Sequence, residues 1–591
     1  MQKNAPYFLT LILIFTMAGG LAVWNTTSFA EETGKDVHEF LYESDPFPSA
    51  QQCKACHPVH YKEWSVSPHA YAQVSPVFNS MQAKITKLTN GTNGDFCIRC
   101  HTPVGMAEHE PLFTSNLERS QVSYEGISCI VCHRRDLPYG KVSARFTPKK
   151  GNIFEPVYGP FDGDEVKRVI ESGEFDVVTE PVKDGRPIHR EAKQFYQITT
   201  AGFCGSCHDV NHVTGFRLEE AFSDYKSSPA AQKGISCQDC HMGKVPGIPS
   251  GYEEMPAAIV GGIPTKPRQK TDHMFVGPDY SVVHPALYPH NSAVTEIAAL
   301  NQWLKFNFTA GWGTDEFEDT VTPDQEFPEP WTDADARYEA REVLQENLEL
   351  LELASQKRKQ LLQNGYQLGD IRVDKMTNKE IRFQVEVQNA TEGHNVPTGF
   401  DAERVVYLEV TVTDKNGKVV FKSGDLDPNG DLRDLHSVYV HNGELKRDPY
   451  LFSLQSKFLV RTIRGGDREQ VLAVNSSADP LPFIRPPVHA TFLTGRPADS
   501  RKHRRTIPPL GNSWAKYKVN ADDLSGSEGP YQATVKLIAG MVPVNLVYEI
   551  QDVGFDYGMS PREVADAVVK GYQVLWERNV LLEPGVIDKN D

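Results

Sequence analysis

The sequence contains five copies of the pattern Cys-x-x-Cys-His, and these copies use all ten of its cysteines. In chain order, motifs 1 to 5 are Cys53/Cys56/His57, Cys97/Cys100/His101, Cys129/Cys132/His133, Cys204/Cys207/His208 and Cys237/Cys240/His241. The two thiols of such a motif can form thioether bonds to the two vinyl groups of a haem, and the adjacent imidazole can bind the iron from one side. The spacing therefore predicts covalent haem attachment.

Zinc knuckles, redox pairs and disulfides are the alternatives for a bare Cys-x-x-Cys pattern, but none of them needs a histidine at the next position. Histidine makes up 19 of 591 residues. Five matches in five motifs would therefore arise by chance with odds on the order of 10⁻⁸. Haem attachment is the interpretation that explains both the cysteines and the histidines.

Further histidines could supply a second ligand to each iron. Nine of the fourteen histidines outside the motifs lie in the first 290 residues. Two axial imidazoles give a low-spin iron that passes electrons with little reorganisation and has no site for a substrate. The predicted distal ligands are His69, His189, His273, His212 and His284, and the further candidates are His60, His290, Met106 and Met242.

An internal repeat singles out one of these histidines. Motifs 2 and 3 begin 32 residues apart and motifs 4 and 5 begin 33 residues apart, and a Gly-Ile-Ser tripeptide precedes both motif 3 and motif 5. Upstream, Trp64-Ser-Val-Ser-Pro-His69 aligns with Tyr225-Lys-Ser-Ser-Pro-Ala230. Since the second copy has Ala230, the local turn does not need a histidine, which favours a ligand role for His69.

The elements downstream of the motifs show two different periods. Residues 331–365 carry one helical apolar stripe, with Thr332 as a possible cap and Gly365 as a possible end, and residues 292–306 form a weaker helical pattern. From about residue 370 the apolar period is two, which predicts strands at 381–387, 405–413, 418–422, 531–538 and 542–550. The capping box Ser560-Pro-Arg-Glu563 predicts a closing helix that runs through Leu575.

The N-terminus predicts export. Residues 1–30 combine Lys3, an apolar run from Phe8 to Val23 and a small-x-small site at Ser28-Phe-Ala30, which is typical of a secretory signal peptide; a retained membrane anchor is the alternative. Cleavage would change the formal net charge from −17 to −18. Such an acidic chain is a poor partner for nucleic acid, and no later apolar run is long enough to span a membrane.

Three weaker patterns lie in the C-terminal half. Asp425-x-Asp427-x-Asn429-Gly430-Asp431 resembles a Ca²⁺ loop, but it lacks the closing Glu and contains Pro428, so an acidic turn is the favoured alternative. His394 is the histidine of this half that is most likely to approach a haem. The basic run Arg501–Arg505 is predicted to be a solvated loop rather than a docking patch.

The residues from Cys53 to Ala70, together with Cys97-Ile-Arg-Cys100-His101-Thr-Pro103 and Cys237-Gln-Asp-Cys240-His241-Met242, resemble the cytochrome c554-like multihaem family. The resemblance covers about residues 45 to 245. It implies closely stacked haems, electron transfer and a distal-ligand role for His69, and some members form extracellular filaments. The fifth motif and the large C-terminal region depart from the family pattern.

The expected fold class is α+β and multidomain. It comprises a signal peptide (1–30), an irregular, mainly α, c554-like pentahaem domain (31–290), a helical connector (291–366) and a C-terminal antiparallel β-sandwich with a closing helix (367–591). The expected function is that of a periplasmic or extracellular pentahaem c-type cytochrome. It would carry electrons through mostly bis-His haems between redox protein partners, other multihaem cytochromes, or copies of itself in a filament or complex. The alternative is a multihaem oxidoreductase that acts on a small nitrogen or sulfur oxyanion at one five-coordinate haem.

Overall fold

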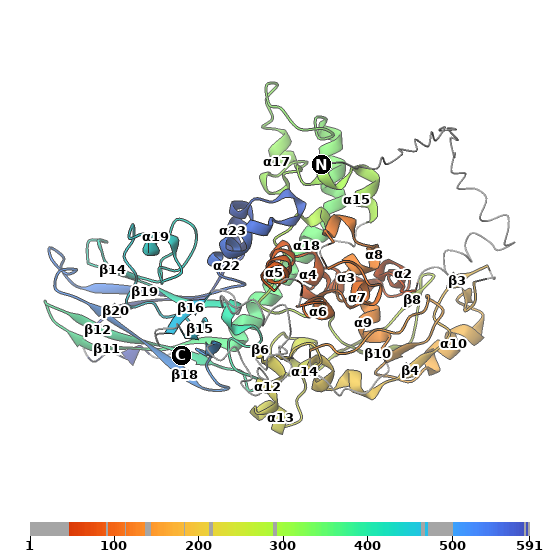
Figure 1. The fold of residues 1–591 in the computed structure, drawn as a ribbon, viewed down its shortest axis with the longest axis horizontal. Coiled ribbons are helices and arrows are strands. Elements are labelled where there is room, and N and C mark those ends of the chain that lie inside the picture. The colour runs from red at the N-terminus through yellow and green to blue at the C-terminus, as the bar shows by residue number, and fades with distance from the viewer. Residues whose placement is uncertain are drawn as a thin grey trace, which may run out of the picture.

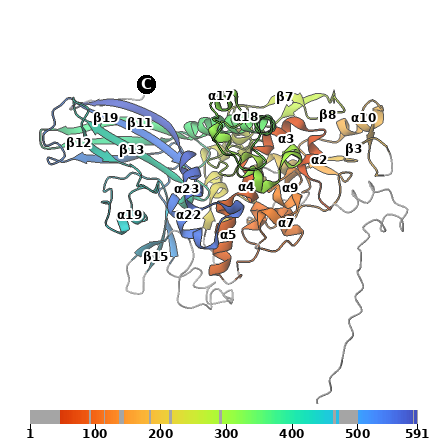
Figure 2. The ribbon, with the colours of Figure 1, turned by 90° about the horizontal axis from the view of Figure 1, so that it is seen from above.

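The computed structural model describes residues 46–583, 585, 587 and 588, except for 90, 92, 113, 136–142, 182–183, 212–216, 288–291, 462–466 and 471–499. A part made of short helices and loops contains the five motifs, and a β-rich part follows residue 365 (Figure 1). The long helix α18 (Ala334–Gly365) runs between the two parts (Figures 1 and 2). The predicted signal peptide lies outside the described residues.

The motif-bearing part is built from short helices, three of which begin at a Ser cap followed by Pro. Ser67 caps α4 (Pro68–Val74) and Ser75 caps α5 (Pro76–Leu88), and in each case the serine side chain accepts a backbone N–H of the first turn. The other α-helices here are α2 (Ala50–Lys54), α3 (Pro58–Ser65), α6 (Ile98–His101), α7 (Pro103–Ala107), α8 (Gln121–Tyr124), α9 (Cys129–His133), α10 (Asp164–Ser172), α11 (Ala201–Cys204), α12 (Ala221–Lys226), α13 (Pro229–Gln232) and α14 (Cys237–His241).

Two-stranded pairs complete this part of the chain. They are β1 (Val157–Gly159) with β4 (Ala192–Gln194), β2 (Val177–Val178) with β3 (Arg186–Pro187), β5 (Val210–Asn211) with β6 (Arg217–Glu219), β7 (Glu253–Pro256) with β10 (Pro267–Lys270), and β8 (Ile259–Val260) with β9 (Ile263–Pro264). Short 3₁₀ turns occur along the chain at η1 (Asn116–Glu118), η2 (Tyr196–Thr199), η3 (Pro285–Leu287), η4 (Phe308–Ala310), η5 (Asp401–Glu403), η6 (Gln551–Val553) and η7 (Asp556–Gly558). Such short elements leave large parts of the backbone free to line a cavity.

The connector contains α15 (Ser292–Ile297), α16 (Leu300–Trp303), α17 (Asp315–Glu318) and α18. The helix predicted for 331–365 is present, but Asp333 caps it instead of Thr332. The weaker pattern at 292–306 forms two short helices because Ala299 has extended backbone between them. This break allows the Trp303 indole to donate to the Val294 carbonyl and to pack against Trp331.

The β-rich part contains two four-stranded antiparallel sheets that share one hydrophobic core. One sheet has the order β18 (Asn512–Val519), β12 (Ile381–Asn389), β11 (Tyr366–Met376), β21 (Ile587–Asp588), and the other β14 (Val419–Ser423), β13 (Val405–Thr413), β19 (Tyr531–Gly540), β20 (Gln573–Leu582). Alternate residues of both sheets, such as Val385 and Val410, are fully buried in that core. The predicted antiparallel sheets are therefore confirmed. A smaller sheet has the order β16 (Asp467–Gln470), β15 (Lys457–Arg461), β17 (Ser500–His503), and α19 (Val438–His441) lies in a loop between strands.

Near the C-terminus, one predicted strand is wrong and the predicted closing helix is present but shorter. Residues 544–550 form a helix, α22 (Val544–Ile550), rather than a strand, because the buried side chains recur at helical spacing. Helix α23 (Pro561–Lys570) begins with the predicted capping box but ends before Gly571, so Leu575 lies in β20. No helix within the described residues has the length and apolar character needed to cross a membrane.

The basic run 501–505 also differs from its prediction as a solvated loop. Its first residues belong to β17, and Lys502 is buried against Asp401, with a Nζ to Oδ1 distance of 2.9 Å. The Arg504 guanidinium donates to both carboxylate oxygens of Asp224, at 3.1 and 2.9 Å. Because Asp224 belongs to α12, these charges join the β-rich part to the motif-bearing part.

Candidate haem-binding site

All five motifs line one continuous cavity of about 1470 Å³. This volume exceeds the roughly 300 to 1,000 Å³ typical of a pocket for one small ligand, so it suits several groups rather than one. None of the ten motif cysteines forms a disulfide. Most of the cavity wall comes from residues 48–279, and the β-rich part adds further residues, including Tyr366, His394 and Arg404.

Backbone carbonyls orient four of the five motif histidines. The Nδ1 atoms of His57, His101 and His133 lie 2.7, 2.7 and 2.8 Å from the carbonyl oxygens of Ala257, Ala72 and Tyr158, and His241 Nδ1 lies 3.4 Å from that of Val276. A carbonyl only accepts, so the proton is on Nδ1 and the Nε2 lone pair is left for a metal. The donor set therefore fits haem iron.

His208 of motif 4 has a carboxylate partner instead. Its Nδ1 lies 3.1 Å from Glu219 Oε1. Burial lowers the pKa of His208, but the Glu219 hydrogen bond and charge outweigh burial and raise it to about 9. A carboxylate on the outer nitrogen makes an imidazole a stronger metal ligand.

The internal repeat is visible in the hydrogen bonds of its two copies. Trp64 Nε1 donates to the Ile127 carbonyl at 2.8 Å, and the Tyr225 hydroxyl donates to the Ile235 carbonyl at 2.9 Å. The same correspondence places His69 and Ala230 at equivalent positions: Ile127 N donates to the His69 carbonyl at 3.0 Å, and Ile235 N donates to the Ala230 carbonyl at 3.0 Å. The Ser-Pro turn and these two hydrogen bonds thus correspond in the two copies, with His69 in one and Ala230 in the other.

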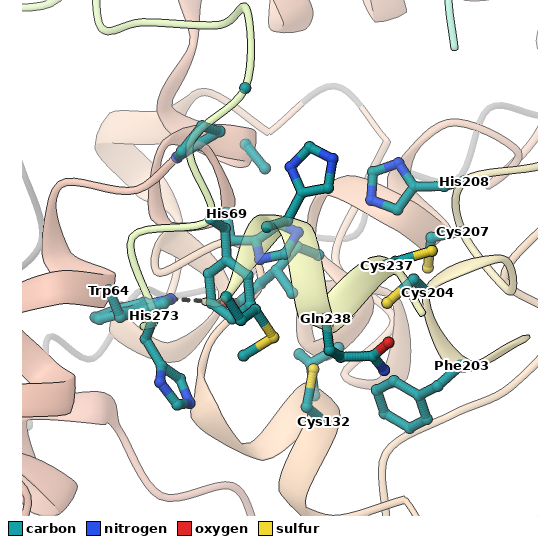
Figure 3. Close-up of a pocket in the computed structure, with 18 of the residues that line it drawn as sticks. Trp64, His69, Cys132, Phe203, Cys204, Cys207, His208, Cys237, Gln238 and His273 are labelled. Carbon is teal, nitrogen blue, oxygen red and sulfur yellow. Dashed lines mark hydrogen bonds between the residues drawn. The ribbon is translucent and has the colours of Figure 1, made fainter. Parts of the chain in front are cut away.

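The side chain of His69 faces motif 4. Its ring centre lies 6.3 Å from that of His208, with an angle of 39° between the ring planes. Burial, and then His208 and His273, lower the pKa of His69 to about 3, so this imidazole is neutral. Figure 3 shows His69, His208 and His273 on the cavity wall.

Three more imidazoles gather near motifs 1 and 3. His189 is buried, and burial followed by the neighbouring His57 lowers its pKa to about 4. His273 has its pKa lowered to about 4 by burial and then by His133. The ring centre of His60 lies 6.0 Å from that of His57 and 4.9 Å from that of His273, and all three extra imidazoles line the cavity.

The structure does not bring every predicted ligand to the cavity. His284 lies among Trp303 and Phe308, where its Nε2 bonds the Phe306 carbonyl at 2.9 Å and its Nδ1 accepts from Ala286 N at 3.2 Å. Both nitrogens are therefore used within the protein, and we do not retain His284 as a ligand. His212 and His290 lie outside the described residues.

Two features of the site were not predicted from the sequence. The ring of His394 lies 6.3 Å from that of His241, with only 18° between the planes. The ring of Phe78 stacks on His101, with ring centres 3.5 Å apart. Both pairs join residues from different elements, so no local spacing could have indicated them.

Thiols of different motifs are neighbours in the structure. Cys129 lies within hydrogen-bonding contact of Cys53, Cys100 of Cys207, and Cys204 of Cys237. Cys132 is also an electrostatic neighbour of Cys204. Cys204, Cys207 and Cys237 gather on one side of the view in Figure 3.

The acidic segment that resembles a Ca²⁺ loop uses its carboxylates within the protein. Asp427 Oδ1 accepts from Asn429 N and Asp431 N, its Oδ2 accepts from the Ser437 hydroxyl, and Asp425 pairs with Arg433. No group of three or more His, Cys, Asp or Glu residues suited to hold a metal ion occurs in the part of the chain that the structure describes.

Comparison with known proteins agrees with the motifs. Residues 52–134, which hold motifs 1 to 3, match the family model described as cytochrome c554 and c-prime. No curated protein matches the chain. A crystal structure of a penta-heme cytochrome c552 from Thermochromatium tepidum is 16% identical in sequence, with 91% of this chain and 97% of that chain covered and a TM-score of 0.45. Residues 52–134, with the first three Cys-x-x-Cys-His motifs, are thus similar to the multihaem c-type cytochromes of the cytochrome c554-like family.

Proposed function

We propose that this protein is an exported pentahaem cytochrome whose role is electron transfer, with one haem on each motif. The placement of all five motifs on the wall of one cavity carries this proposal. Bound haem supplies a one-electron couple, and rapid transfer requires such groups to be closely spaced. The protein supplies this spacing by placing ten attachment sulfurs on the wall of one cavity.

The thiol contacts also suggest an order of neighbours. Motif 1 touches motif 3 through Cys53 and Cys129, and motif 4 touches motif 2 through Cys207 and Cys100. Motif 4 touches motif 5 through Cys204 and Cys237, and Cys132 of motif 3 is close to Cys204. Motif 4 is thus the neighbour of motifs 2, 3 and 5, which makes it the branch point of the proposed assembly.

Paired imidazoles support low-spin iron at several motifs. We assign His69 to the iron held by His208, and we assign His189 to the iron held by His57, its largest electrostatic neighbour. Among the neighbours of His273, His133 has the strongest electrostatic effect on its pKa, so we take His273 as the candidate second ligand for the iron of motif 3. His60 lies between these groups, where it can act as an alternative ligand or as a packing residue.

A haem count combined with a reductive titration of the full-length protein tests the proposal. We expect five covalent haems per chain and uptake of five electrons, followed by transfer to a second haem protein without consumption of a small substrate. Bound zinc, or fewer covalent haems than motifs, would contradict it. The natural partner is expected to be another redox protein in the periplasm or outside the cell.

An enzymatic role at motif 2 is the second candidate, and one observation favours it. Phe78 stacks on one face of the His101 ring. Among the described residues, the imidazole that acts electrostatically on His101 is that of His208, which belongs to motif 4. The Arg404 guanidinium, paired with Asp279 at 2.5 and 3.0 Å, lines the same cavity and could hold a small oxyanion. A high-spin iron in the oxidised wild-type protein, together with turnover of nitrite, hydroxylamine or sulfite, would support this role.

We also propose the division into a pentahaem domain (31–290), a helical connector (291–366) and a β-sandwich domain (367–591). Support comes from the separate core of the two sheets and from the length of α18. Expression of residues 367–591 alone, followed by a cooperative unfolding transition, would test whether the last of these units folds independently.

A further inference from the structure

We propose that His394 is the axial ligand opposite His241, so that the β-rich part of the chain completes the site of motif 5. This inference rests on the proposed attachment of haem to that motif. It assigns a metal-binding role to a residue far from all five motifs in the sequence. The β-rich part would then supply one of the two iron ligands at motif 5.

The distance and orientation of the two rings carry the inference. Two imidazoles on opposite sides of one metal ion, each with its nitrogen about 2 Å from the metal, have ring centres roughly 6 Å apart. The centres of His241 and His394 are 6.3 Å apart, and their planes differ by 18°. The pair His69 and His208 shows the same 6.3 Å separation. Both rings of the His241 and His394 pair line the cavity.

The hydrogen bonds leave the correct nitrogen available on each ring. His241 Nδ1 bonds the Val276 carbonyl at 3.4 Å, and His394 Nδ1 bonds the Asn395 carbonyl at 2.8 Å. Within the described residues, no hydrogen bond to the Nε2 atom of either ring is present.

The simpler alternative is that His394 is a packed core histidine. His394 is half-buried, and its Nε2 has no hydrogen bond within the described residues although the ring lines the cavity. A packing role alone would be filled as well by an apolar side chain. A metal bound to Nε2 would give the imidazole a role that packing does not.

The loop around His394 is held from both parts of the molecule. On the β side, the Asn389 side chain donates to the His394 carbonyl at 2.9 Å. On the motif side, Ala230 N donates to the Glu392 carbonyl at 3.1 Å, and the Thr398 hydroxyl donates to Asp224 at 2.9 Å. These bonds fix the distance of the ring from motif 5, as a metal ligand requires.

Replacement of His394 by Ala in the full-length, haem-loaded protein tests the inference. We expect all five haems to remain attached, while one of the five irons changes from low-spin to high-spin in the EPR spectrum of the oxidised protein. Added imidazole should restore the low-spin signal, which a purely structural role would not permit. The matched control is His284→Ala, which removes another buried histidine and should leave every spin state unchanged.

The outcomes separate this inference from the proposed function. An unchanged EPR spectrum of His394→Ala with five haems attached would overturn the ligand assignment and leave the electron-transfer proposal intact. A wild-type protein without covalent haem would overturn both. If His394→Ala does not fold, His394→Met decides the question: a raised reduction potential of one haem supports the assignment, because Met and His ligation raises potential, and an unchanged potential overturns it.

Discussion

At the scale of single residues, the cysteines and the histidines of each motif have different roles. In the proposed haem-bearing protein the cysteines would attach the haems, and the hydrogen bond at Nδ1 leaves the Nε2 atom of each of these imidazoles available for iron. The two repeat copies then differ in one side chain, because His69 and Ala230 occupy the same backbone position. The first copy therefore has a candidate iron ligand, His69, at a position where the second copy has Ala230 with the same backbone hydrogen bond.

Replacement of His69 by Ala should remove the second ligand from the iron held by His208. The backbone of the second copy already tolerates Ala at this position, so we expect little loss of stability, within about 1 kcal/mol. One of the five irons should become high-spin in the EPR spectrum. The exposed His441→Ala variant serves as the control, and an unchanged spectrum of His69→Ala would refute the assignment.

Two equivalent glycines offer a matched comparison beside the same residue. Gly126 and Gly234 both have positive φ, +65° and +73°. A Cβ at Gly126 would lie 2.8 Å from the His69 carbonyl oxygen, whereas a Cβ at Gly234 would meet nothing within 4 Å. The left-handed backbone costs each Ala variant about 1–2 kcal/mol, so that cost cancels in the comparison.

We therefore expect Gly126→Ala to lose about 1–3 kcal/mol more free energy of unfolding than Gly234→Ala, because only the former must displace the backbone at His69. Urea denaturation of both variants measures the difference. Equal losses would show that the contact at Gly126 relaxes freely. A shift in the haem absorption of Gly126→Ala alone would indicate that the displacement reaches His69.

At the scale of elements, sequence reasoning succeeded where the signal is local. The tight turn after residues 405–413 and the capping box at Ser560 predicted β13 and the start of α23. The prediction of a strand at 542–550 was wrong, because a dense apolar run is compatible with both a helix and a strand. Packing against other elements decides which side chains are buried, and it selects the helix α22. His394 was named as a candidate, but its pairing with His241 depends on tertiary structure alone.

The acidic turn at residues 425–431 predicts an unusual pH dependence. Asp431 is buried, and burial followed by repulsion from Asp427 raises its pKa to about 8. The folded state then binds more protons than the unfolded state between the ordinary carboxyl pKa and pH 8, so stability falls as pH rises through this window, by at most about 1.4 kcal/mol per pH unit. Asp431→Asn should flatten this dependence.

Thermal unfolding measured from pH 5 to 9 checks the prediction for Asp431. The exposed Asp522→Asn variant should keep the slope of the wild type. A slope that survives in Asp431→Asn would contradict the assignment. If added Ca²⁺ stabilised the wild type, the loop would be a metal site with an ionised Asp431, and the acidic-turn interpretation would be wrong.

At the scale of the whole molecule, the β-rich part is packed against the motif-bearing part over several elements. Helices α22 and α23 share a hydrophobic cluster with Tyr71, Val74 and Val77 of the α4–α5 segment. Arg404 is paired with Asp279, and Arg504 with Asp224, across the same boundary. The placement of His394 beside motif 5 depends on this packing, so the two parts should unfold together.

Arg504→Met should uncouple the two parts, because it leaves the buried Asp224 without the guanidinium that donates to both of its carboxylate oxygens. Since about a third of the Arg504 side chain is exposed, we expect a moderate loss, about 1–3 kcal/mol. Soret absorbance follows the haem-bearing part and far-ultraviolet circular dichroism follows the sheets. In the wild type the two unfolding transitions should coincide, and in Arg504→Met they should separate.

The neighbouring Arg505 is exposed, and its guanidinium forms no ion pair with the described residues, so Arg505→Met should behave like the wild type. Coincident transitions at an unchanged midpoint in Arg504→Met would mean that the apolar contacts of α22 and α23 alone hold the β-rich part in place.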